Sequence, residues 1–272
     1  MNNYSTDSAG WVSRSHRAIF PFELARAFTV EEAVNLLATK KDGRLIAGGL
    51  DVTREMRAGQ SHRLLIDISA IDELKGIRRE ANFIRIGALT THWEIETDPL
   101  IKEFLPDFQE AWKTIGNIRI RMRGTVGGNL LAKNAGYDGQ LLLGVCGAFL
   151  DFANIHGCYR VGAENICTEE TALSLLVSIL VPIVKEQKIG FDRSLKPVVS
   201  VAASLKGNAA KIGFGCVSSQ PTFWSGEGEV EAETIMSIVP NKEDAPIGTM
   251  DYRRRMIGVL SKRLISNLQG KL

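Results

Sequence analysis

The sequence has few cysteines, and they are not grouped. The chain of 272 residues contains four, none of them in a C-x-x-C pair: Cys146, Cys158, Cys167 and Cys216. Zinc sites and iron–sulfur clusters use closely spaced thiolates. We therefore expect reduced, buried thiols and no metal site or iron–sulfur cluster held by this chain.

The sequence also lacks a strong charge of one sign and long apolar segments. The formal net charge is +2, which gives no electrostatic reason to expect nucleic acid as a partner. No apolar run reaches the roughly 20 residues that a membrane-spanning helix needs. The opening segment MNNYSTDSAGWVSRSHR has no apolar stretch followed by a cleavage site, so we expect a cytoplasmic protein without a membrane span.

Helix start signals are clear in the first half of the chain. Thr29 with Glu32 and Thr91 with Glu94 have the spacing of capping boxes, in which each side chain satisfies a backbone N–H group near the other. Asp98, directly before a proline, predicts another helix start. The other elements predicted here are strands at 44–52, 64–69 and 83–90, and helices at 53–59 and 107–116.

The chain changes character near residue 172. Further strands are predicted at 148–155 and 174–182, and helices at 229–239 and 250–268. Residues 198–217 predict two strands joined by a turn at Lys206-Gly207-Asn208. We expect an α+β fold with domains at 1–172 and 173–272, rather than one parallel sheet.

Two pairs of glycines each follow or interrupt an apolar run: Gly48-Gly49 in LIAGGLD and Gly127-Gly128 in GTVGGNL. Consecutive glycines let backbone N–H groups converge on an anion, because no Cβ atom stands in the way. The pairs could equally be tight turns, and neither is the G-x-G-x-x-G pattern of an ordinary dinucleotide fold.

Two polar residues follow the second pair. Asn129 offers both amide donors and a carbonyl acceptor, and Asp138 could accept hydrogen bonds from a ribose or a ring N–H group. Asp138 could instead cap a helix that begins at Gly139. The residues alone leave these alternatives open.

Taken together, several segments resemble one family: IAGGLDV, LLIDISAIDELKGI, IRIGALTTHWEI, IGNIRIRMRGTVGGNLLA, SLLVSILVP and DYRRRMIGVLSKRLI. The chain resembles the FAD-binding medium subunit of molybdenum hydroxylases, such as carbon monoxide dehydrogenase and xanthine dehydrogenase, from about Phe20 to about residue 265. The resemblance implies a two-part FAD-binding domain of the vanillyl-alcohol-oxidase type, with subdomains at about 20–58 and 59–172. A small α+β domain with an antiparallel sheet and helices would follow it.

The resemblance also implies a cofactor site on both sides of the FAD pyrophosphate. The first loop corresponds to Leu45, Ile46, Ala47, Gly48, Gly49, Leu50, Asp51 and Val52. The second loop corresponds to Thr125, Val126, Gly127, Gly128 and Asn129. Asp138 matches an acidic residue that binds the cofactor, and Ile115 and Leu176 match apolar positions against the flavin or adenine. No catalytic side chain is implied.

The implied function is electron transfer within a complex. Electrons would pass from 2Fe–2S clusters through FAD to NAD+, a quinone or another acceptor. The clusters would belong to an iron–sulfur small subunit and the molybdenum cofactor to a large subunit, in a dimer of heterotrimers. The alternatives are a self-sufficient FAD-dependent oxidase and a flavin-free assembly subunit.

The sequence departs from the family pattern at a few positions. Leu50 stands where the first loop usually has a small polar residue, and Lys133 and Tyr137 replace a stretch of small residues. The resemblance does not assign a basic residue near the flavin, for which Arg193 and Lys196 are the candidates.

Two other features admit more than one interpretation. His92 could serve as a covalent flavin attachment site, but we expect a surface histidine near a helix start. Arg119, Arg121 and Arg123 could steer an acidic partner or contact a phosphate. In an extended segment they would share one face, which we expect to be solvated.

Overall fold

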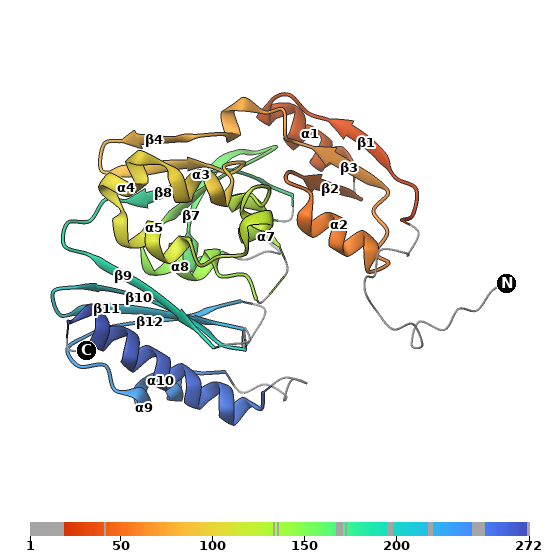
Figure 1. Cartoon of the computed structure of the whole chain (residues 1–272). Helices are drawn as coiled ribbons and strands as arrows, with labels where there is room; N and C mark the ends of the chain where they lie inside the picture. The colour runs from red at the N-terminus through yellow and green to blue at the C-terminus, as the bar shows by residue number, and fades with distance from the viewer. Residues whose placement is uncertain are drawn as a thin grey trace.

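The computed structural model describes residues 19–40, 42–132, 134, 136–166, 171, 173–194, 198–216, 220–240 and 248–270. Three units follow one another along the chain, each built on its own sheet (Figure 1). The N-terminal unit lies beside the other two. Those two form alternating layers: a five-stranded sheet, helices, a four-stranded sheet and the C-terminal helices.

The N-terminal unit is a three-stranded parallel sheet of order β1-β3-β2 with two helices. Its elements are β1 (Glu23–Arg26), α1 (Val30–Thr39), β2 (Gly43–Ile46), α2 (Leu50–Arg57) and β3 (Leu64–Asp67). Thr29 caps α1 as predicted, since its side chain accepts a hydrogen bond from the N–H group of Glu32. The Glu32 carboxylate accepts a hydrogen bond of 2.7 Å from the N–H group of Phe28, one residue before Thr29, whose N–H group a capping box would use.

The middle unit is an antiparallel five-stranded sheet of order β4-β5-β8-β6-β7. Its strands are β4 (Ile77–Glu80), β5 (Phe83–Gly87), β6 (Phe149–Asn154), β7 (Gly157–Gly162) and β8 (Leu175–Pro182). Its helices are α3 (His92–Thr97), α4 (Pro99–Phe104), α5 (Pro106–Trp112), α6 (Ile118–Arg121), α7 (Val126–Leu131) and α8 (Gly139–Val145), with short 3-10 turns at Asp72–Leu74 and Ala163–Asn165. Thr91 and Glu94 form the predicted capping box at α3, and Asp98 caps α4.

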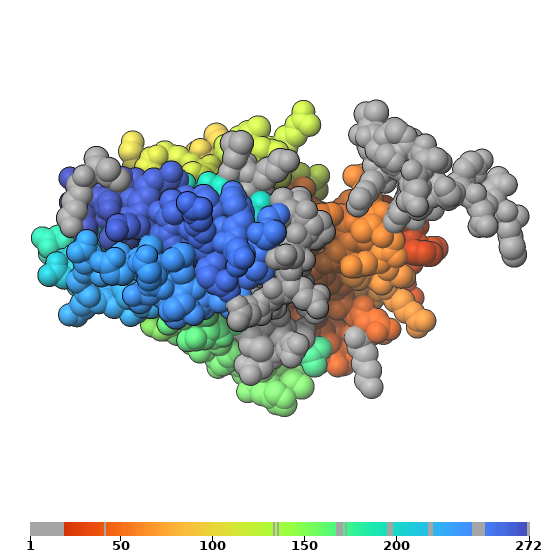
Figure 2. Space-filling view, turned by 90° about the horizontal axis from the view of Figure 1, so that it is seen from below, coloured from red at the N-terminus to blue at the C-terminus, as the bar shows by residue number. Residues whose placement is uncertain are grey.

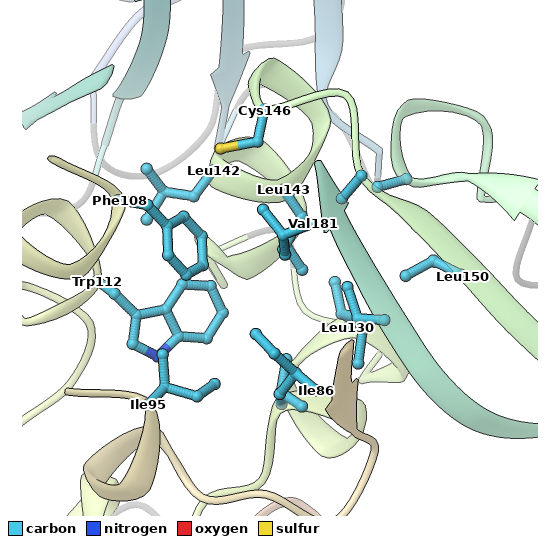
Figure 3. Close-up of a cluster of buried hydrophobic side chains, with 14 of the residues drawn as sticks. Ile86, Ile95, Phe108, Trp112, Leu130, Leu142, Leu143, Cys146, Leu150 and Val181 are labelled. Atoms are coloured by element: carbon cyan, nitrogen blue, oxygen red, sulfur yellow. The ribbon is translucent and has the colours of Figure 1, made fainter. Parts of the chain in front are cut away.

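The sheet and helices of the middle unit share one apolar core. Trp112 and Phe108 of α5 pack against each other in it at a ring separation of 5.1 Å, with Leu142 of α8 beside Phe108 (Figure 3). Burial of such side chains contributes on the order of 1.5–3 kcal/mol each. This core fixes the helices that carry the second glycine pair. The domain limits of 1–172 and 173–272 remain a prediction, and β8 lies beyond residue 172 yet pairs with β5 and β6.

The C-terminal unit is an antiparallel sheet of order β12-β11-β10-β9. Its elements are β9 (Lys188–Arg193), β10 (Ser200–Lys206), β11 (Ala209–Gly215), β12 (Thr222–Glu227), α9 (Ala232–Ser237) and α10 (Met250–Leu268). The predicted hairpin between β10 and β11 is confirmed, with Gly207 at φ +57 in the turn. The predicted α+β fold with an antiparallel C-terminal sheet is also confirmed. In the described part of the chain, no helix is long and apolar enough to cross a membrane.

The strand predicted at 44–52 ends at Ile46, and residues from Leu50 onward belong to α2. The prediction for the arginine segment was also wrong. The segment with Arg119, Arg121 and Arg123 is not extended, because α6 spans Ile118–Arg121. Asn117 caps this helix, and its Oδ1 accepts a hydrogen bond from the Ile120 N–H group at 3.2 Å. Arg119 and Arg123 are exposed, as expected for a solvated surface, whereas Arg121 turns inward to Glu96 of α3.

Candidate functional site

A cavity of about 700 Å³ is lined mainly by residues of the N-terminal and middle units, together with Arg193 at the end of β9. Both glycine pairs line it, one from each unit. Figure 2 shows the N-terminal unit in orange and red at one side of the molecule and the C-terminal helices in blue at the other. The sequence predicted that two glycine loops would lie together, and the structure brings them together.

The first glycine pair forms a turn between β2 and α2. Gly49 is the N-cap residue of α2 in the left-handed conformation, with φ +77, which favours glycine. No side chain among the described residues caps this helix. The N–H groups of its first turn have no partner within the helix, so they are available to an anion.

Gly48 lies directly against the backbone of the second glycine stretch. A Cβ atom on Gly48 would overlap the carbonyl oxygen of Arg123. The Arg123 guanidinium also donates a hydrogen bond of 3.3 Å to the Gly48 carbonyl oxygen. Glycine at position 48 is thus required for the two loops to meet.

The second glycine pair has a different role from the first. The N–H groups of Val126 and Gly127 donate to the carbonyl oxygens of Thr90 and Ala88, both at 2.9 Å. The Gly128 N–H group donates to the Thr125 hydroxyl at 3.1 Å. These donors are used within the protein, so this loop forms a closely packed wall of the cavity, whereas α2 offers the open N–H groups.

Asn129 and Asp138 lie near the start of α8 and line the cavity. Asn129 Oδ1 accepts a hydrogen bond of 3.0 Å from the Gly139 N–H group, which ties the second loop to α8. Asp138 is the N-cap residue of α8, which begins at Gly139 as the capping alternative predicted, but its side chain makes no capping hydrogen bond.

The Asp138 carboxyl group is buried at the cavity. Its side chain is almost inaccessible to solvent and its Oδ1 accepts no hydrogen bond from the described residues. Its Oδ2 lies 3.8 Å from Arg193 Nη1. Burial raises the pKa of Asp138, and the Ser200 hydroxyl and Arg193 partly oppose that effect. An unsatisfied buried acceptor is suited to a ligand donor.

Most of the predicted cofactor residues line the cavity: Leu45, Ala47, Gly48, Gly49, Leu50, Asp51, Val52, Ile115, Thr125, Gly127, Gly128, Asn129, Asp138 and Leu176. Two do not. Ile46 packs against the small cluster of Val52, Met56 and Leu65, and Val126 is fully buried in the core of the middle unit. Ile115 and Leu176, both buried, provide apolar surface at the cavity.

Polar side chains that the sequence did not assign also reach the cavity. The Tyr137 hydroxyl donates a hydrogen bond of 3.1 Å to Asp51 Oδ1, and Arg54 donates to the same oxygen at 2.6 Å. Arg44 and Arg193 line the cavity as well. Arg44 and Arg54 gave no sequence signal beyond their closeness to the first glycine pair. Lys133 and Lys196 lie outside the described residues.

The expectation of a surface location for His92 was wrong. The side chain is buried, lines the cavity and packs against Trp112, with the rings 5.4 Å apart and tilted by 34°. Its Nδ1 has no hydrogen-bond partner among the described residues. Burial, with a smaller contribution from Arg121, lowers the pKa of His92 to about 4, so the imidazole is neutral at physiological pH.

These features fit a dinucleotide. A pyrophosphate binds free backbone N–H groups, such as those in the first turn of α2. An extended ligand needs an elongated space into which no Cβ atom projects, and an aromatic ring system needs apolar walls. Gly48, the Asp138 carboxyl and the Ile115 and Leu176 side chains meet these needs in one cavity.

Comparison with known proteins agrees with this geometry. Residues 20–183 match the family described as the FAD binding domain in molybdopterin dehydrogenase. The chain is 25% identical over 271 residues to the glyceraldehyde dehydrogenase medium chain of Sulfolobus acidocaldarius, covering 89% of this chain and 96% of that one. It is 26% identical over 282 residues to the carbon monoxide dehydrogenase medium chain of Afipia carboxidovorans, covering 92% and 97%.

The fold is similar to that of a solved structure. A chain of the carbon monoxide dehydrogenase from Hydrogenophaga pseudoflava superposes with a TM-score of 0.86 at 24% identity, covering 93% of this chain and 99% of that one. This superposition confirms the α+β fold, and the match to the family model confirms the expected family and FAD as the cofactor. The chain belongs to the family of FAD-binding domains in molybdopterin dehydrogenases.

Proposed function

We propose that this chain is the electron-transfer subunit of a molybdenum-containing dehydrogenase complex in the cytoplasm. It accepts electrons from 2Fe–2S clusters of a small subunit and passes them through FAD to NAD+, a quinone or another acceptor. A large subunit holds the molybdenum cofactor, and the complex is a dimer of heterotrimers. Support comes from the full-length similarity to chains named as medium chains of dehydrogenases.

The observation that carries the proposal is the first turn of α2 at the contact between the two glycine loops. Gly49, Leu50 and Asp51 present the N–H groups that would hold the pyrophosphate. Thr125, Gly127, Gly128 and Asn129 form the opposite wall, and Leu45, Ala47 and Val52 shape the near side.

Other residues would hold the two ends of the cofactor. The Asp138 carboxyl would accept a hydrogen bond from a ribityl hydroxyl or a ring N–H group, since its buried Oδ1 has no donor among the described residues. Ile115 and Leu176 would cover an aromatic ring and exclude water from it. Val126 and Ile46 do not line the cavity; their packing in the apolar clusters would hold the two loops in place.

When bound, the flavin supplies chemistry that side chains lack, because it exchanges electrons singly and in pairs. The residues of this chain hold and orient it. Asp138 and Arg193 place a carboxyl and a cation at the cavity, and His92 is neutral beside it. None of these groups needs to act as a nucleophile.

The test combines spectroscopy with purification of the complex. The purified chain is stripped of cofactor, titrated with FAD and followed by flavin absorption, and the native complex is assayed for iron and molybdenum. We expect FAD uptake, and flavin reduction by a reduced iron–sulfur partner. Direct reduction by a small alcohol without any partner would favour the self-sufficient oxidase, and a folded chain that binds no FAD would favour the assembly subunit.

A further inference from the structure

The C-terminal sheet packs along the helix that begins after Asp138. Helix α8 contacts both β10 and β11, so it lies between the middle and C-terminal units (Figure 1). Two buried serines of β10, Ser200 and Ser204, are four positions apart and therefore point to the same face of the strand. The Ser204 hydroxyl donates a hydrogen bond of 2.7 Å to the carbonyl oxygen of Val145, at the end of α8. This face of β10 is therefore the one toward α8.

Ser200 interacts with Asp138 at the other end of α8. A hydrogen bond from the Ser200 hydroxyl to the Asp138 carboxyl acts to lower the pKa of Asp138, against the larger effect of burial. Arg193, the Cα partner of Ser200 in the pairing of β9 with β10, also approaches this carboxyl, with Nη1 3.8 Å from Oδ2. The C-terminal sheet thus places two donors at Asp138.

A third group continues the chain of polar contacts. The Ser200 Oγ lies 3.7 Å from the Sγ of Cys216, the residue directly after β11. Burial raises the pKa of the Cys216 thiol, so the thiol stays protonated at neutral pH. A protonated thiol is a weak donor. It can donate to the Ser200 oxygen, while the Ser200 hydroxyl donates to Asp138.

This end of the C-terminal sheet is fixed by Arg253 of α10. Its Nη1 donates hydrogen bonds to the carbonyl oxygens of Cys216 and, at 3.3 Å, of Val198, and its Nε donates to that of Gly248 at 3.1 Å. Cys216 has φ +68, a left-handed conformation that is uncommon for residues other than glycine. Such a conformation persists where the surroundings impose it. The C-terminal unit therefore sets the position of the Ser200 hydroxyl.

The contacts from the C-terminal sheet leave one oxygen of Asp138 available. Oδ1 has no hydrogen-bond partner among the described residues, and Asp138 lines the cavity. Ser200 is 0% exposed and is not among the lining residues, so it can act on a ligand in the cavity through Asp138. An ionised carboxylate accepts shorter and stronger hydrogen bonds than a neutral carboxyl group. A donor that keeps Asp138 ionised therefore strengthens its bond to a ligand.

We propose that Ser200 is a positioning residue of the FAD site, which holds the Asp138 carboxylate in place with Oδ1 free for a donor of the cofactor. The C-terminal unit thereby completes a site whose walls belong mainly to the other two units. This inference rests on the proposed function and adds to it a residue that does not touch the cofactor.

Other charged and titratable groups also surround Asp138 and the cavity. They are Arg193 of β9, Cys216 after β11, Arg253 of α10, His92 of α3, Arg44 after the start of β2, Asp51 and Arg54 of α2, and Tyr137. A pH profile of the wild-type chain contains contributions from all of them. In an Asp138→Asn background these other groups remain, so the difference between the two backgrounds isolates Asp138.

The test compares Ser200→Ala with the matched control Ser204→Ala. Both serines are buried on the same face of β10, and Ser204→Ala also removes a hydrogen bond to α8, but one that does not involve Asp138. Each substitution is made in the full-length wild-type chain and in Asp138→Asn. The dissociation constant for FAD is measured by titration at a series of pH values, and urea unfolding measures the stability of each apo chain.

We expect Ser200→Ala to weaken FAD binding by about 10-fold at neutral pH, since a hydrogen bond to a charged group is lost. FAD affinity should fall as Asp138 becomes protonated, and in Ser200→Ala this fall should begin at a higher pH than in wild type. Ser204→Ala should lower stability but keep the wild-type affinity and profile. In the Asp138→Asn background, Ser200→Ala should change the affinity by less than about 2-fold.

Ser200→Cys provides a second variant of nearly the same size with a weaker donor. It should shift the profile in the same direction by a smaller amount, and it carries the test if Ser200→Ala does not fold.

Three results would overturn the inference. A wild-type profile in Ser200→Ala and Ser200→Cys would show that Ser200 does not act on Asp138, and the proposed function would stand. An equal loss of affinity at every pH and in both backgrounds would show that Ser200 has a structural role. A folded wild-type chain that binds no FAD would overturn the proposed function as well.

Discussion

Gly48 and Arg123 meet backbone to backbone, because a Cβ atom on Gly48 would overlap the carbonyl oxygen of Arg123. The two residues come from different units, and their contact brings the two glycine loops together at the cavity. The backbone of the first loop can approach the second only where no side chain intervenes.

We predict that Gly48→Ala weakens both the fold and FAD binding. The new methyl group must push the Arg123 carbonyl away, which costs about 1–3 kcal/mol of unfolding free energy, and it displaces the N-terminus of α2 from its position at the cavity. Flavin content after titration with FAD and chemical unfolding of the apo chain measure the two effects. Gly162→Ala is the control, because a Cβ atom there meets nothing closer than Asn165 Nδ2 at 3.5 Å. Equal FAD affinity in the two variants would contradict the role given to Gly48.

Local sequence signals predicted some elements of the fold. The capping box of Thr91 and Glu94, the turn at Gly207 and the helical pattern at 250–268 each depend on neighbouring residues, and all three are confirmed. The alternation of isoleucine and arginine before the second glycine pair resembled a strand. It is a helix because Asn117 caps it and Arg121 turns inward to Glu96.

The site residues that belong to local sequence motifs could be predicted. Those that depend on contacts between distant parts of the chain could not. The glycine pairs and Asp138 stood out in the sequence, and all of them line the cavity. Tyr137 and Asp51 are 86 positions apart, and no local rule pairs them. The burial of His92 depends on its packing against Trp112, which a capping motif next to it does not reveal.

We predict that Asp138→Asn weakens FAD binding but raises the stability of the apo chain. Burial raises the pKa of Asp138, so the ionised carboxylate costs free energy in the apo chain, and asparagine relieves that cost. Loss of an acceptor oxygen should nevertheless weaken FAD binding by about 1–3 kcal/mol. Equilibrium titration should therefore show a lower FAD affinity, and urea unfolding of the apo chain should show a higher free energy of unfolding.

The control for Asp138 is Asp72→Asn. The Asp72 side chain is 92% exposed and forms an ion pair with Lys75 across the end of a surface turn. Neither FAD affinity nor apo stability should change by more than about 0.5 kcal/mol. If Asp138→Asn lowered both quantities together, its role would be structural.

We predict that Tyr137→Phe speeds FAD dissociation. The Tyr137 hydroxyl reaches Asp51 at the start of α2 from the loop after the second glycine pair, so it links the two walls of the cavity. Loss of this hydrogen bond lowers the free energy of unfolding by about 1 kcal/mol, while Arg54 still donates a hydrogen bond to Asp51. Stopped-flow displacement of bound FAD measures the rate. Tyr252→Phe, at an exposed position on α10, is the control and should leave the rate unchanged.

We predict that His92 makes the apo chain lose stability between pH 6.5 and about 4. Because burial lowers the pKa of His92 to about 4 in the folded chain, the unfolded chain takes up a proton first as the pH falls. The stabilisation is fully present above pH 6.5, and its loss amounts to roughly 3 kcal/mol by pH 4. His92→Phe keeps a ring against Trp112 without a titrating group, so urea unfolding at several pH values should show a flatter profile for this variant. His156→Gln, at an exposed turn, should follow the wild-type profile, and parallel curves for wild type and His92→Phe would show that His92 does not carry the effect.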